Sequence, residues 1–202
     1  MSVDYFGKYF NDQGFDFTRL LNDDFFQPVR ILFNAKHYVS ASKLLVVAID
    51  SMSHIEYGEI PENTFIKWLK EYSDIQSLGI TAEELWEHRN SLLHMSNLKS
   101  RKVASGKERA LVAYVGEPHP GVKLDQTNTS YYNLYSLIKV IGNACGSWCL
   151  TYDKDRKKIH TFVARYDLIA SDARMLNIEY EVPKIANKSL KHRHFVAGQQ
   201  VA

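Results

Sequence analysis

The chain contains 202 residues, of which 45% are hydrophobic and 24% are charged, and this is the composition of a globular protein. Ten Gly and five Pro are too few for a long linker or a collagen-like region, and the length predicts one domain, or one domain with an appendage. The net charge of +2 conceals an asymmetry: residues 1–98 contain 8 Lys and Arg against 14 Asp and Glu, whereas residues 99–202 contain 17 against 9. The second half is therefore the half suited to face an anion.

Neither secretion nor a membrane span is predicted. The N-terminus lacks the basic stretch and apolar run of a secretory signal, and no run of about 18 apolar residues occurs. The two cysteines, Cys145 and Cys149, lie four apart in a predicted helix, a spacing more typical of core packing than of a disulfide framework. We therefore expect a cytoplasmic protein with buried, reduced thiols and no membrane contact.

Three helices are predicted before residue 80. Residues 25–33 form the first, with Pro28 in its first turn, where the missing N–H is tolerated. The second is the clearest, because its apolar residues recur at the spacing of a buried helical stripe: Ala41, Leu44, Leu45, Ala48, Ile49, Met52 and Ile55. Pro61 opens a third and shorter segment, which ends before Ser77-Leu78-Gly79.

The next helix begins at a capping box, in which Thr81 and Glu84 can each satisfy a backbone donor at the other's position. It is expected to run to about Asn97. Residues 99–130 break the helical pattern and predict a loop or a small β-hairpin, with a strand in the apolar run Ala110–Val115.

Two more helices are predicted, over about 131–152 and about 156–177, from their apolar periodicity. Gly142 and Gly146 in the first of them have the spacing that allows close approach of a second helix. We expect them to serve tight packing within the molecule.

These elements predict an all-α fold, a bundle of five to seven helices with one small insertion. We assign residues 1–24 to an N-terminal extension and residues 25–180 to the helical domain. The insertion occupies 99–130. Residues 181–202 form a basic tail that we expect to be loosely held, as chain ends often are.

Several enzyme signatures are absent from the sequence, among them the P-loop, the dinucleotide-binding glycines and the zinc-protease helix. His192 and His194 are too few to make a metal site, so no metal or other cofactor is expected. Basic residues cluster at 154–158 and 184–193, where they could hold phosphates, although solvated surface charge is the commoner role.

The helix that follows Thr81 carries the strongest candidate for chemistry: Arg89, Asn90 and His94. Leu85, Trp86, Leu92 and Leu93 mark its buried side, and Asn90 and His94 share a polar face with Arg89 at the border. An imidazole can move the proton of a ribose 2′-hydroxyl, and a guanidinium can hold a phosphate and its developing charge. The three residues are therefore suited to RNA cleavage without a metal.

This pattern resembles the HEPN domains, helical bundles that bear an Arg-x(4–6)-His motif with a polar residue, often Asn, directly after the Arg. Here the motif reads Arg89-Asn90-Ser91-Leu92-Leu93-His94, and it follows a long helix rich in Ala, Leu and Ile, as in that family. The resemblance covers roughly residues 25–98 and one later helix.

The resemblance implies an endoribonuclease of a toxin–antitoxin, phage-defence or RNA-processing system. It implies a homodimer with two motifs facing one cleft, RNA as the substrate, and a protein antitoxin as a further partner. By the same resemblance, His94 is the general acid or base, Arg89 the phosphate clamp, and Asn90 an orienting hydrogen-bond donor. Ser91, Glu87 and Asp50 are conceivable helpers.

Two other hypotheses remain open. The chain could be a catalytically inactive HEPN-like module that binds RNA or protein, since some members of the family have lost catalysis. Alternatively, it is an unrelated helical scaffold in which Arg89 makes an ion pair with Glu87 or Asp50 and His94 is structural. Trp68, Trp86 and Trp148 could stack on bases, but tryptophans at helical spacing usually belong to the core.

Overall fold

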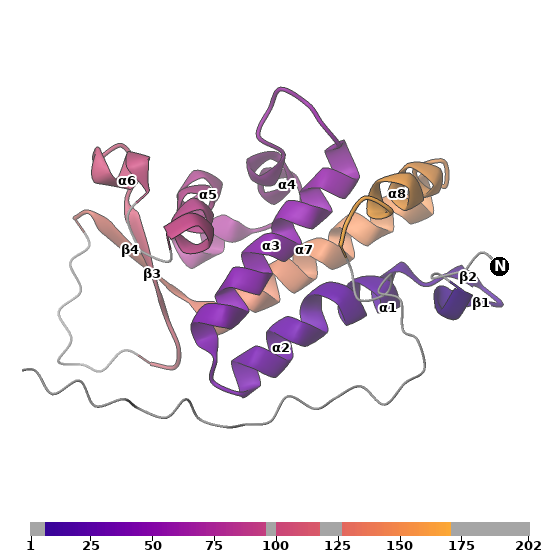
Figure 1. Cartoon of the computed structure of the whole chain (residues 1–202), viewed down its shortest axis with the longest axis horizontal. Helices are drawn as coiled ribbons and strands as arrows, with labels where there is room; N and C mark the ends of the chain where they lie inside the picture. The colour runs from indigo at the N-terminus through magenta and orange to yellow at the C-terminus, as the bar shows by residue number, and fades with distance from the viewer. Residues whose placement is uncertain (1–6, 96–99, 118–126, 171–202) are drawn as a thin grey trace, which may run out of the picture.

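The computed structural model describes residues 7–95, 100–117 and 127–170 (Figure 1). Within these ranges, six helices have eight residues or more: α2 (Gln27–Asn34), α3 (Tyr38–Tyr57), α4 (Thr64–Tyr72), α5 (Ala82–Asn90), α7 (Leu134–Lys154) and α8 (Lys158–Tyr166). This agrees with the predicted helical bundle. None of the described helices is long and apolar enough to cross a membrane.

Helix α3 is the central element of the bundle. It packs against α2, α4, α7 and α8, and Figure 1 shows α2 beside it and α7 behind it. The predicted buried stripe is confirmed except at Leu44, which is exposed. The helix ends at Gly58, whose φ of +65° favours glycine and where a Cβ atom would lie 3.0 Å from the Arg165 guanidinium.

The chain before α3 belongs to the same core. A short antiparallel pair, β1 (Phe10–Asn11) with β2 (Gly14–Phe15), precedes α1 (Phe17–Leu21) and a π-helical turn at Asn22–Phe26. Buried residues of this segment join the central hydrophobic cluster: Tyr9, Leu20, Leu21, Phe25 and Phe26. Pro28 lies in the first turn of α2, as predicted.

Asparagine and threonine caps set where α4 and α5 begin. The Asn63 side chain accepts a hydrogen bond from the Ile66 N–H, so α4 starts after Asn63 and not at Pro61. The predicted capping box of Thr81 and Glu84 is present at α5, with both of its hydrogen bonds. After Asn90 the helix continues as a π-helical turn, Ser91–Met95.

The insertion is not a hairpin. After the short helix α6 (Arg101–Ala104), β3 (Ala110–Tyr114) pairs with β4 (Thr129–Asn133) in a parallel ladder. Parallel pairing means that the chain returns to the starting end of β3 before β4 begins, which a two-residue turn cannot achieve. Asn133 then caps α7, so this helix starts at Leu134 and not at residue 131.

Two predictions about the last helices need correction. The predicted helix over 156–177 extends only over Lys158–Tyr166 in the described chain, and residues 171–177 lie outside the described residues, as does the 181–202 tail. Gly142 and Gly146 do not serve tight packing, because a Cβ atom added at either would meet no heavy atom within 4 Å. Both glycines line an open cavity instead.

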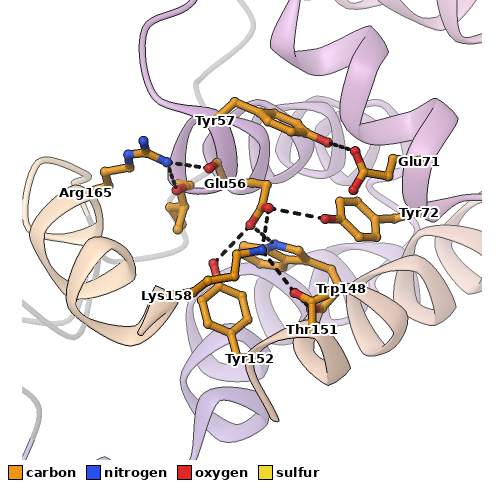
Figure 2. A network of polar contacts seen from close by, with 10 residues as sticks. Glu56, Tyr57, Glu71, Tyr72, Trp148, Thr151, Tyr152, Lys158 and Arg165 are labelled. Atoms are coloured by element: carbon orange, nitrogen blue, oxygen red, sulfur yellow. Dashed lines mark hydrogen bonds and ion pairs between the residues drawn. The ribbon is translucent and has the colours of Figure 1, made fainter. Parts of the chain in front are cut away.

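One buried carboxylate joins four helices (Figure 2). Glu56, near the end of α3, accepts hydrogen bonds from Trp148 Nε1 on α7 at 2.8 Å and from Lys158 Nζ on α8 at 2.5 Å. The Tyr72 hydroxyl on α4 and the Tyr152 hydroxyl on α7 each donate to it at 3.3 Å. Its side chain is only 9% exposed, so these partners replace the water that a carboxylate otherwise requires.

The electrostatic balance at Glu56 favours the charged form. Burial raises the pKa of this carboxyl, but the hydrogen bonds from Lys158 and Trp148 outweigh burial and leave the pKa below its ordinary value. Arg165 on α8 adds a second tie, because its Nη1 donates to the backbone oxygens of Ile55, at 2.8 Å, and Glu56. The end of α3 is thereby fixed to α7 and α8.

We predict that Glu56→Gln lowers the free energy of unfolding by about 2–4 kcal/mol, because Lys158 loses its buried counterion. Glu62→Gln is the matched control, since Glu62 pairs with Lys67 at 2.9 Å on the surface, and it should lower stability by less than about 1 kcal/mol. Urea unfolding measures both. Equal, small losses in the two variants would contradict the central role of Glu56.

Candidate active site

Arg89, Asn90 and His94 come together where α5 passes into its π-helical turn. Arg89 Nη1 donates to Asn90 Oδ1 at 3.2 Å and lies 3.5 Å from His94 Nε2. His94 is exposed, whereas Asn90 and Arg89 are half-buried. The three side chains that the sequence singled out therefore form one cluster that solvent and a ligand can reach through His94.

Arg89 is held from a second helix. Its Nη2 donates to Asp50 Oδ2 on α3 in a short ion pair, and the guanidinium carbon lies 5.0 Å from the centre of the Trp86 ring. The Arg89 side chain is 18% exposed and that of Asp50 30%. The buried Nε of Arg89 has no hydrogen-bond partner among the described residues. The ion pair expected with either Glu87 or Asp50 is thus made with Asp50.

The other two conceivable helpers are turned away from the cluster. Glu87 is buried, and its carboxylate pairs with Lys102 Nζ at 3.1 Å. Ser91 is fully buried, and its hydroxyl donates to the Glu87 backbone oxygen at 3.1 Å. Of the three helpers that the sequence suggested, only Asp50 contacts a motif residue here.

A shallow groove of about 440 Å³ runs along α3 and includes Asp50 in its lining. Its lining consists of Val47, Asp50, Ser51, His54, Thr64 and Ile169. His54 was missed in the sequence, although it lies four residues after Asp50 and so on the same face of α3. Only the contact between Asp50 and Arg89, which are 39 residues apart, places His54 near the motif.

The cluster has the parts needed for proton transfer beside a phosphate. Asp50 occupies one nitrogen of the guanidinium, and the other, Nη1, faces Asn90 and His94. An N–H of Arg89 pointing at His94 Nε2 requires a free electron pair there, so this contact suits the neutral imidazole with its proton on Nδ1. A phosphate that took the place of His94 at Nη1 would free the Nε2 electron pair of this imidazole to accept a proton.

His88, next to Arg89 in the chain, has a structural role. It is 5% exposed, and its Nε2 lies 3.1 Å from the Tyr132 hydroxyl of β4. Burial lowers the pKa of His88 to about 4, so the side chain is neutral near pH 7. This contact fixes the motif helix α5 to the parallel strand pair.

Other candidate binding residues are already engaged or lie elsewhere. Lys158, in the basic cluster at 154–158, pairs with Glu56, while Lys154, Arg156 and Lys157 are exposed. The second basic cluster and the two tail histidines lie outside the described residues. Among the residues that are described, His, Cys, Asp and Glu side chains do not gather in groups of three that could hold a metal ion.

The tryptophans divide between the core and the site. Trp68 and Trp148 are fully buried and pack edge to face with their ring centres 6.2 Å apart, so neither can stack on a base. Trp86 is half-buried and lies beneath Arg89.

Comparisons of the chain with protein-family models, with curated proteins and with solved structures found no match. The resemblance to HEPN domains therefore rests on the sequence motif and its helical context.

We predict that Arg89 and Asp50 are energetically coupled. A double-mutant cycle with Arg89→Gln and Asp50→Asn should give a coupling energy of about 1–2 kcal/mol in urea unfolding, because both groups are partly shielded from solvent. The same cycle on the exposed pair of Lys70 and Glu83 should give less than about 0.5 kcal/mol. Coupling no larger than in that pair would mean that Asp50 does not hold Arg89.

His88 should make stability depend on pH. Its folded pKa of about 4 lies below its ordinary value of 6.5, so the unfolded chain binds a proton first as the pH falls. Above pH 6.5 His88 is neutral in both states and does not lower stability. As the pH falls from 6.5 to 4, the free energy of unfolding decreases by up to about 3 kcal/mol, because only the unfolded chain gains the proton. His88→Gln should flatten the curve of unfolding free energy against pH in this window. The control is His160→Gln, at an exposed position of α8, which should leave the slope of unfolding free energy against pH unchanged. If His88→Gln also left this slope unchanged, the lowered pKa of His88 would be refuted.

Proposed function

We propose that this chain is a metal-independent endoribonuclease of the HEPN kind. The observation that carries the proposal is the contact of one guanidinium nitrogen, Arg89 Nη1, with both His94 Nε2 and Asn90 Oδ1 at an accessible place on the molecule. This arrangement places a hydrogen-bond donor for a phosphate oxygen beside an imidazole nitrogen that can accept a proton. The basic second half of the chain supports a polyanionic substrate.

The reaction we propose is attack of a ribose 2′-hydroxyl on the adjacent phosphorus. His94 accepts the hydroxyl proton through Nε2 while the 2′-oxygen bonds to phosphorus. Arg89 stabilises the negative charge that develops on the phosphate oxygens, and Asn90 keeps the guanidinium in place. The bond to the 5′-oxygen breaks, that oxygen takes up a proton, and the products are a 2′,3′-cyclic phosphate and a 5′-hydroxyl.

Asp50 has a defined part in this proposal. Asp50 neutralises Arg89 in the unliganded chain, and a phosphate bound at Nη2 would compete with this carboxylate. A phosphate bound at Nη1 would leave the Asp50 contact at Nη2 intact and would displace His94 from Nη1 instead. Asp50 then acts as a positioning residue that fixes the plane of the clamp.

We also propose that the active form is a homodimer. Three large apolar side chains of α3 are exposed, Val39 (64%), Leu44 (39%) and Val47 (40%), and Val47 also lines the groove. Exposed apolar residues along one helix suit a protein interface. A dimer formed there would bring a second motif near the first, in keeping with the resemblance, and a protein antitoxin would compete for the same face.

The second candidate is a catalytically inactive RNA- or protein-binding module. It is favoured by one observation, the ion pair with Asp50, which reduces the charge that Arg89 offers to a phosphate. Such a module would bind without producing cleaved ends, and binding would depend little on His94.

The test is cleavage of a mixed RNA pool in EDTA by the wild type and four variants. We expect His94→Ala and Arg89→Ala to reduce cleavage at least about 100-fold, as removal of a general base or of a charge-stabilising group does. The matched controls are His160→Ala and Arg156→Ala, both at exposed positions outside the cluster, which should retain wild-type rates.

Circular dichroism and urea unfolding of each variant establish that lost activity is not lost folding. Cleavage that survives His94→Ala would refute the catalytic role of the motif. Retention of RNA by the wild type with no cleaved ends in any condition would favour the binding module.

A further inference from the structure

A cavity between α7 and the segment that contains α1 and α2 is lined by both cysteines. Cys145 and Cys149 lie one helical turn apart, and they share this cavity of about 250 Å³ with Gly142, Gly146 and residues of the N-terminal segment. Both thiols are free; Cys145 is buried and Cys149 is half-buried. The site lies outside the proposed nuclease cluster and uses none of its residues.

The two thiols are not equivalent. A hydrogen bond between them lowers the pKa of Cys149 and raises that of Cys145, and burial raises the pKa of Cys145 further. Since the thiolate is the attacking form of cysteine, the more accessible Cys149 is also the better nucleophile. Cys145 is placed to react with whatever is attached to Cys149.

The cavity has space and charge for an anionic reagent. Gly142 and Gly146 present no side chain to it, and no heavy atom lies within 4 Å of where their Cβ atoms would be. Arg30 contributes a guanidinium to the lining, held by a hydrogen bond from Nη2 to Asn22 Oδ1 at 2.6 Å. Arg30 therefore offers a complementary charge to a small molecule with carboxylates, and the nearby Asp153 carboxylate, which acts to raise the pKa of Cys149, opposes it.

We propose that Cys149 and Cys145 form a dithiol modification site for anionic low-molecular-weight disulfides of the glutathione disulfide class. The Cys149 thiolate attacks one sulfur of the reagent, forms a mixed disulfide and releases one glutathione thiolate. The Cys145 thiol gives up its proton, its sulfur attacks Cys149, and the second glutathione leaves as a thiolate. The protein loses two hydrogens, and the reagent is reduced to two thiols.

Helix geometry allows this disulfide but makes it strained. Residues four apart in an α-helix have Cα atoms about 6 Å apart, within the range that a disulfide spans. Their Cβ atoms are about 5–6 Å apart, farther than a relaxed disulfide accepts. Gly142 and Gly146 weaken the helix around the pair and let it deform, and a strained bond is readily reduced again.

The modification would reach the core of the bundle. Trp148, adjacent to Cys149 in α7, donates the hydrogen bond that helps to hold Glu56. Deformation of α7 at Cys145–Cys149 therefore acts on the contact that fixes α3.

The experiment treats the folded, full-length chain with glutathione disulfide and measures intact mass and the position of each modification. The wild type should lose two hydrogens and carry no lasting adduct. Cys145→Ser, or Cys145→Ala if the serine variant does not fold, should accumulate one glutathione on Cys149. Cys149→Ser should remain unmodified, because Cys145 is buried.

Charge recognition has its own control. Arg30→Gln should slow modification by glutathione disulfide at least about threefold and leave the reaction with cystamine, a cationic disulfide, unslowed. The proposal is overturned if both thiols stay reduced in the folded wild type but react in urea. It is also overturned if Cys149→Ser is modified at Cys145 as fast as the wild type reacts.

Discussion

The buried carboxylate of Glu56 is the interaction on which the arrangement of this molecule depends. A charge that is removed from water must find partners within the chain, and those of Glu56 come from α4, α7 and α8 (Figure 2). Apolar packing alone would let these helices slide, whereas a charged network with directed hydrogen bonds specifies one register. Because Glu56 belongs to α3, the same network also fixes Asp50, less than two turns earlier.

Asp50 connects α3 to the candidate site through its ion pair with Arg89. The carboxylate binds one side of the Arg89 guanidinium, and the other side faces His94 and Asn90. His88, on α5, contacts the Tyr132 hydroxyl of β4, so α5 is held both by α3 and by the parallel strands. Arg89 is therefore held by contacts from two helices, whereas His94 is exposed to solvent.

Local patterns in the sequence predicted most of the helical fold. The stripe on α3 and the capping box at Thr81 follow from neighbours within one or two turns, and both are confirmed. The parallel pairing of β3 and β4 was not predictable, because it depends on how the chain returns between them. Likewise, Glu56 is 92 residues from Trp148 and Asp50 is 39 residues from Arg89, so neither contact leaves a local pattern. Asn90 and His94 share a helix with Arg89 and were found in the sequence, whereas His54 is associated with them only through tertiary structure.

The most direct measurement compares the products of the wild type on two oligoribonucleotide pools of one sequence composition, one unmodified and one fully 2′-O-methylated, in EDTA. The account predicts 2′,3′-cyclic phosphate and 5′-hydroxyl ends from the unmodified pool and no cleavage of the methylated pool, because the attacking hydroxyl has been blocked. Cleavage of the methylated pool, or ends that carry a 3′-hydroxyl, would contradict attack by the 2′-oxygen. Absence of cleavage of both pools would contradict catalysis by the Arg89 and His94 cluster itself.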